Sequence, residues 1–228
     1  MTALLWKDYR LNRLLLGFGL LMLAIPLLIG VSYNLYLQWR YDESWWTQRF
    51  WQGIACASLG LSLFTFAMLG ASAIAAERAD RSAEFLAYLP ASRRAIITSK
   101  AIIAIGAGLF IWIVNLVLCY VVAPHGGGGP EDAMARSSDA LTVMIPPLAA
   151  TSVLLFGAGW FWSSFMPGHA ISTGLSFSTL AFVGCSLGSW EYLSGSSMVE
   201  KWYVPICLTL GIIGFVAGTV CYLRRVEP

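Results

Sequence analysis

The most densely charged part of the sequence is a short segment, ERADRSAEFLAYLPASRR, at residues 77–94. It contains four arginines and three acidic residues, whereas residues 50–76 and 101–123 contain no Asp, Glu, Lys, Arg or His. Guanidinium groups donate charge-assisted hydrogen bonds to the carboxylates of a partner protein or to lipid phosphate, and carboxylate groups accept such bonds from a partner protein. The segment is therefore the first candidate for a functional site, and the chemistry it offers is binding.

No motif in the sequence indicates catalysis or cofactor binding. The chain lacks GxxxxGK[ST], so it has no P-loop for ATP. The histidines His125 and His169 have no neighbours at ligand spacing, and the five cysteines fall in apolar runs without a CxxC pair. We therefore expect no catalytic residue, no cofactor and no metal site, and we expect that the protein is not an enzyme.

The composition indicates an integral membrane protein. Of the 228 residues, 58% are hydrophobic and 11% are charged, whereas soluble domains contain about 25% charged residues. So few polar side chains could not cover such an apolar core in water. Because the apolar segments are spread from one end of the chain to the other, we predict a single membrane domain.

Six apolar segments are long enough to cross a hydrocarbon layer of about 30 Å as helices. They are residues 14–37, 50–76, 101–123, 141–165, 170–188 and 203–223. The fifth is the weakest, because it is short and rich in Ser, Thr and Gly. These runs do not alternate in polarity as barrel strands would, so the predicted fold class is all-α, with a six-helix transmembrane domain at residues 14–228. None of the six contains a charged residue or a histidine, which argues against an ion-coupled transporter.

The positions of Lys and Arg indicate the orientation of the spans. With the N-terminus inside, ten of these residues lie on the cytoplasmic side and four lie in the outer loops. The positive-inside rule therefore places both termini in the cytoplasm. We expect a multi-pass protein of the plasma membrane.

Residues 1–13 precede the first span and include the run TALLWKDYRLNR. Leu5, Trp6 and Tyr9 fall near one face of a helix, with Lys and Arg around them. We therefore predict a short amphipathic helix that lies at the membrane interface. A basic flank that only sets the orientation is the alternative.

The predicted orientation places residues 77–100 in the cytoplasm, and the first part of this loop has helical spacing. Glu77 and Arg81 are four residues apart with the acid first, which is the favoured order for a helical ion pair. Phe85, Leu86 and Leu89 form a small apolar patch at helical spacing. The sequence therefore predicts a short amphipathic helix with arginines beside an apolar patch.

A sharp turn and a second helix should follow. Pro90 stops the first helix, and Ser92 occupies the position of an N-cap for the next one. Arg93 and Arg94 come directly after this cap, although each positive charge at a helix N-terminus costs about 0.3–1 kcal/mol. A negatively charged neighbour would offset this cost. The residues alone leave two candidates open, a groove on a partner protein and the phosphates of lipid headgroups.

The run ERADRSAEFLAYLPASRRAIITSKAII resembles the loop between the second and third helices in permease subunits of ATP-binding-cassette exporters of the type-2 branch. Those subunits commonly have a Glu at the end of the second helix, then xEfLxxLPxSR, then a Lys at the start of the third helix. The opening LLWKDYRLNRLLL is similar to the N-terminal connecting helix of the same family. Near Arg81 the chain departs from the family, which usually has a glycine there. The matching positions are Glu77, Glu84, Phe85, Leu86, Leu89, Pro90, Ser92, Arg93 and Lys100.

The resemblance implies that residues 82–89 form a coupling helix, which docks on a separate ATPase subunit and passes its movement to the spans. The implied interface residues are Glu77, Arg81, Glu84, Phe85, Leu86, Leu89, Arg93 and Arg94. The implied partners are an ATP-binding-cassette ATPase subunit, a second copy of this chain or a similar permease, and membrane lipid, with no nucleic acid.

The resemblance leaves the substrate open among lipids, drug-like molecules and peptides. The alternative function is that of a non-transporting membrane anchor or assembly protein, whose charged loop recruits a cytoplasmic partner.

Overall fold

The computed structural model describes residues 2–41, 48–79, 92–122, 130–166, 168–195 and 198–224. Within these ranges the chain forms helices and no strand. Each helix contains a stretch that is long and apolar enough to cross a membrane, and each predicted span overlaps one of them. The helices are α1 (Thr2–Tyr41), α2 (Gln48–Ala79), α4 (Arg93–Val122), α5 (Pro130–Ser163), α6 (His169–Ser194) and α7 (Met198–Arg224). The prediction of an all-α protein with six spans is confirmed.

The N-terminal segment differs from the expected arrangement. The sequence predicts a separate interfacial helix at residues 1–13, whereas α1 continues without a break from Thr2 to Tyr41. No Gly or Pro occurs between Thr2 and Leu16, so the sequence contains no signal that would end a helix there. The rings of Trp6 and Tyr9 are exposed and their centroids lie 5.8 Å apart, as expected for side chains at a membrane interface.

The weakest predicted span, the fifth, is the complete helix α6. Its 26 residues correspond to roughly 39 Å at about 1.5 Å per residue, which is enough to cross a bilayer. Hydroxyl groups in its first half donate hydrogen bonds to carbonyls one turn earlier, for example Ser176 to Ser172 at 2.8 Å. The helix ends at Gly195, which has a φ of 63° and donates its N–H to the Glu191 carbonyl at 2.9 Å. A left-handed residue at this position is the usual place for glycine.

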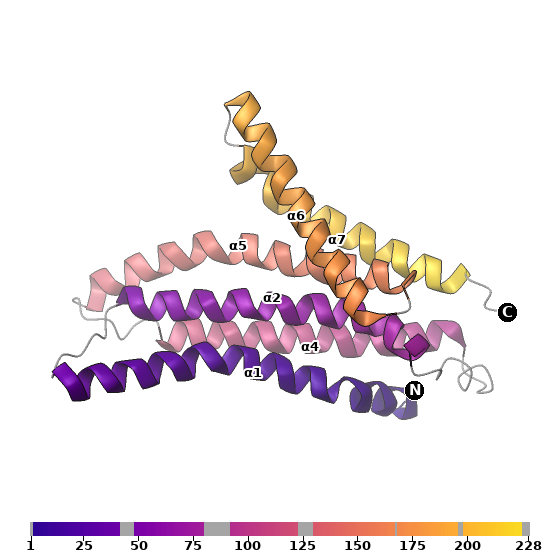
Figure 1. The fold of residues 1–228 in the computed structure, drawn as a ribbon, viewed down its shortest axis with the longest axis horizontal. Helices are drawn as coiled ribbons and strands as arrows, with labels where there is room; N and C mark the ends of the chain where they lie inside the picture. The colour runs from indigo at the N-terminus through magenta and orange to yellow at the C-terminus, as the bar shows by residue number, and fades with distance from the viewer. Residues whose placement is uncertain are drawn as a thin grey trace.

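Two helices, α2 and α5, form the centre of the bundle (Figure 1). They are the most buried spans, and they pack directly against each other. On one side, α2 contacts α1 and α4; on the other, α5 contacts α6 and α7. The paired far ends of α6 and α7 project away from the other helices in Figure 1, which leaves Trp190, Tyr192 and Leu193 exposed.

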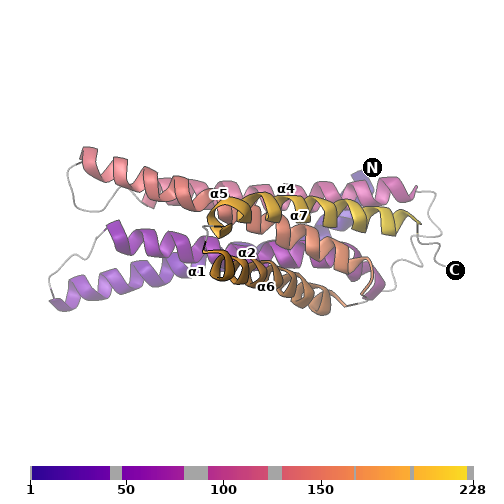
Figure 2. The same ribbon diagram turned by 90° about the horizontal axis from the view of Figure 1, so that it is seen from above.

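The start of α1 and the end of α7 lie at the same end of the bundle (Figure 2). The end of α2, the start of α4 and the connection between α5 and α6 lie at this end as well. We call it the terminal end. An even number of spans brings the two termini to one side, and the proposal that this side faces the cytoplasm rests on the Lys and Arg distribution.

Glycines bring the backbones of the central helices into direct contact. A methyl group built on Gly70 of α2 would overlap the Phe156 carbonyl of α5, and one on Gly157 of α5 would overlap the Gly211 carbonyl of α7. Small residues allow this approach, and in lipid close van der Waals packing is a main source of helix association. The three helices α2, α5 and α7 are therefore packed backbone to backbone.

Candidate functional site

The candidate site lies at the terminal end, where α2 ends at Ala79 and α4 begins at Arg93. Arg93 and Arg94 occupy the first turn of α4, and both side chains are exposed. Glu77 lies in the last turn of α2, and its side chain is outside the described part of the chain. The other predicted interface residues lie outside the described residues as well: Arg81, Glu84, Phe85, Leu86 and Leu89.

Ser92 caps α4, as the sequence predicts. Its Oγ accepts a hydrogen bond from the Ala95 N–H at 3.3 Å, and its carbonyl accepts one from the Ile96 N–H at 3.2 Å. The cap fixes the point at which the chain becomes helical again. As a result, α4 begins eight residues before the predicted start of the third span at residue 101. The two arginines are thus held on a regular helical turn.

Behind this turn, two adjacent residues of α4 reach toward two different helices. Ser99 is buried and its Oγ donates a hydrogen bond to Oδ2 of Asp8 in α1, at 2.6 Å. The buried Lys100 donates from Nζ to the carbonyl of Ala73 in α2. Buried charged groups need such partners, because an isolated charge in an apolar environment is very costly. Through these two bonds the start of α4 is connected to both α1 and α2.

Asp8 was not identified as a site residue from the sequence. It lies within the segment predicted to be an interfacial helix, yet only 4% of its surface is exposed. One signal was available, since Asp8 is the single acidic residue among the first 41. A lone acid in a basic, apolar segment is more consistent with a specific partner than with a lipid-facing position.

A second polar cluster lies deeper in the bundle. Ser58 of α2 donates from Oγ to Oδ1 of Asn115 in α4 at 3.1 Å, and it also lies 3.3 Å from the Leu23 carbonyl of α1. Asn115 Nδ2 in turn donates to the Ile111 carbonyl at 2.9 Å. The same three helices that meet at the terminal end are therefore linked again within the membrane, by a hydrogen bond of the kind expected for a polar residue in a span.

The fold and the site together define the class of protein. It is a polytopic helical membrane protein with an exposed turn that carries two arginines and is connected to three spans. Residues 5–179, which are more than half of the chain, match the family described as ABC-2 family transporter protein. The chain belongs to this family, and it is a multi-pass membrane transporter permease. Comparison with curated proteins gives no match, and comparison with solved structures gives none either. The matched range includes both Asp8 and the loop that carries the charged segment.

Proposed function

We propose that this chain is the membrane-spanning subunit of an ATP-driven exporter, which couples ATP hydrolysis by a separate ATPase subunit to movement of a substrate across the membrane. ATPase activity then belongs to the partner. The permease works as a homodimer or beside a similar permease. The family match supports the permease function, and the geometry at the start of α4 supports the coupling role.

The observation that carries the proposal is the position of Arg93 and Arg94. Both are exposed on the capped first turn of α4, next to the segment proposed to be the coupling helix. Five and six residues further along, Ser99 and Lys100 contact α1 and α2. A force on the arginine turn is therefore passed to three spans through short, buried hydrogen bonds.

Rigid packing extends this path. Trp160 of α5 packs in one cluster with Ala73 of α2 and Ile97 of α4, and its ring centroid lies 4.9 Å from that of Phe215 in α7. Packed cores transmit displacement because they have few voids. Movement of the α4 start is thus expected to reach α5 and α7 as well.

The proposal is tested by co-expressing the chain with an ATP-binding-cassette ATPase encoded next to it. Charge reversal by the double substitution Arg93→Glu and Arg94→Glu should lower co-purification by at least about tenfold, since wrong-sign charges at an interface cost a few kcal/mol and each 1.4 kcal/mol is about tenfold in affinity. Replacing Phe85, Leu86 and Leu89 by serine should have the same effect.

Lys201→Glu is the matched control, because it reverses an exposed charge in the first turn of α7, at the end of that helix away from the terminal end. Unchanged co-purification and unchanged ATPase stimulation in the arginine variant would contradict the coupling role. Retained ATPase binding with no transport of any substrate would favour the alternative, an anchor that recruits a cytoplasmic partner. Labelling of a cysteine at position 93 from the outer side only would refute both.

A further inference from the structure

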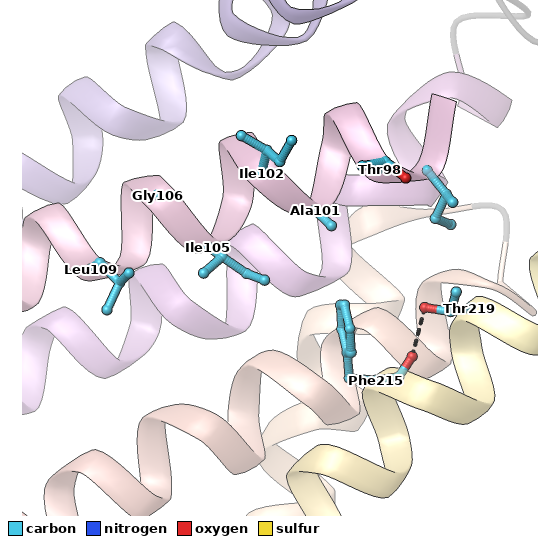
Figure 3. A pocket seen from close by; sticks show the side chains of 9 residues that line it. Thr98, Ala101, Ile102, Ile105, Gly106, Leu109, Phe215 and Thr219 are labelled. Carbon is cyan, nitrogen blue, oxygen red and sulfur yellow. Dashed lines mark hydrogen bonds between the residues drawn. The ribbon is translucent and has the colours of Figure 1, made fainter. Parts of the chain in front are cut away.

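A continuous apolar groove runs along the bundle between α4 and α7. Its section nearer the terminal end has a volume of about 510 Å³ and is shown in Figure 3. A deeper section of about 530 Å³ continues it and is bounded by α5 as well. The two sections share Ile105, Leu109 and Phe215. Each volume lies within the range of about 300–1,000 Å³ that is typical of small-molecule sites.

The groove opens sideways, toward the surface that faces lipid. Ile102, Ile105 and Leu109 line it from α4, and each is exposed by 44% or more. Phe215 stands between the two helices, and Gly106 lies along the α4 wall (Figure 3). A methyl group on Gly106 would meet no atom within 4 Å, so this part of the wall borders open space. The groove is therefore accessible to an elongated apolar group from the membrane.

Positive charge lies on the α4 side of the groove mouth at the terminal end. Arg94 precedes the lining residue Thr98 by one helical turn, as the hydrogen bond from Thr98 Oγ1 to the Arg94 carbonyl shows, at 2.7 Å. The Arg94 side chain is exposed. The N-terminal end of α4 adds the positive end of its own helix dipole.

We infer that the α4–α7 groove binds an anionic phospholipid of the leaflet at the terminal end, with one acyl chain in the groove and the phosphate at Arg94 and the N-terminal end of α4. The groove is long enough to hold an acyl chain of this ligand. The α4 lining runs from Ile97 to Leu116, which is roughly 28 Å at about 1.5 Å per residue, so the groove is longer than one leaflet of a hydrocarbon core about 30 Å thick. An apolar wall with a cationic mouth recognises a phosphate-bearing lipid better than a neutral one.

The first test blocks the groove. The protein is purified without any ATPase, incubated with palmitoyl-oleoyl phosphatidylglycerol, and analysed by native mass spectrometry for retained lipid. Gly106→Leu should lower the bound fraction by about tenfold, because leucine takes up the contacts that the acyl chain makes. Gly17→Leu is the matched control, since it adds the same side chain to equally open space on α1. Where Gly106→Leu gives no folded protein, Ile102→Trp serves the same purpose.

The second test concerns the headgroup. Arg94→Gln should weaken binding of phosphatidylglycerol by about fivefold. Binding of phosphatidylcholine with the same acyl chains should stay weak and unchanged. Arg13→Gln, an exposed arginine of α1, is the control for general charge loss.

Equal retention of the two lipids by the unmodified protein overturns the inference. The inference is also overturned if the Gly106→Leu variant retains its lipid. It is overturned as well if this variant keeps the lipid but no longer forms a dimer, because the groove would then hold a second copy of the chain. Since these measurements contain no ATPase, they can fail while the proposed coupling function stands, and the reverse also holds.

Discussion

Gly211 provides the sharpest test of the packing that connects the spans. A methyl group on this residue of α7 would lie 2.5 Å from the Val153 carbonyl oxygen and 2.7 Å from the Val153 carbonyl carbon, both in α5. Ordinary van der Waals contact begins at 3.4 Å. In Gly211→Ala, α7 must therefore move away from α5 by about 0.9 Å, which is the difference between 3.4 Å and 2.5 Å.

The cost of this movement follows from the contacts that separate. A radial gap of about 0.5–1 Å loses between a quarter and a half of the dispersion energy of each atom pair. Overpacking a close contact costs about 1–3 kcal/mol, whereas the better helix propensity of alanine returns about 0.5–1 kcal/mol. We expect a net destabilisation of about 1–2 kcal/mol, and a domain of this size then melts about 2–8 °C lower.

The assay is thermal unfolding in detergent, followed by size-exclusion chromatography of the remaining folded protein. Gly60→Ala is the matched control, because a methyl group on this exposed glycine of α2 meets no atom within 4 Å. Its melting temperature should stay the same or rise slightly. If Gly211→Ala and Gly60→Ala melt at the same temperature, the inference of backbone contact between α5 and α7 is wrong.

Three further substitutions test individual hydrogen bonds. Ser99→Ala should lower the free energy of unfolding by about 1.5–3 kcal/mol and reduce transport-coupled ATPase activity, because it removes a buried hydrogen bond to a carboxylate. The measurement is chemical unfolding, with Thr98→Ala as the control, since that variant loses only an exposed hydrogen bond within α4. Asn115→Leu removes the acceptor of Ser58 and should cost about 0.6–1.7 kcal/mol in the same experiment, and no measurable loss would argue against this link. Glu191→Ala removes the carboxylate that accepts from the Val199 N–H at 3.0 Å, so amide exchange at Val199 should accelerate about fivefold, as for the loss of a helix cap worth about 1 kcal/mol.

Much of the fold could be predicted because it depends on local properties of the chain. A run of about 20 apolar residues specifies a membrane helix wherever it occurs, since lipid offers no partner for an unpaired backbone group. The Ser92 cap was predictable for a similar reason, because the cap and the N–H that it accepts are three residues apart. The interface residues between 81 and 89 remain predictions from sequence and resemblance.

The continuity of α1 shows where interpretation of the sequence went further than the pattern. The basic, aromatic start of the chain suggested a separate helix on the membrane surface. The sequence contains no residue that would end a helix before Gly17, and α1 is continuous. Amphipathic character indicates which environment a face prefers, but it does not indicate where a helix stops.

The sequence by itself determined that this is a helical membrane protein with six spans, and which loop carries the charge. Only the tertiary structure decided that Asp8 bonds to Ser99, 91 residues away, that Gly211 touches a backbone while Gly106 borders an open groove, and that α2 and α5 lie at the centre. The physical reason is that hydropathy reports the transfer of a segment from water to lipid. In the membrane a leucine facing lipid and a leucine facing a helix are nearly equivalent, so the choice of neighbours depends on shape and on hydrogen bonds between residues that are distant in sequence.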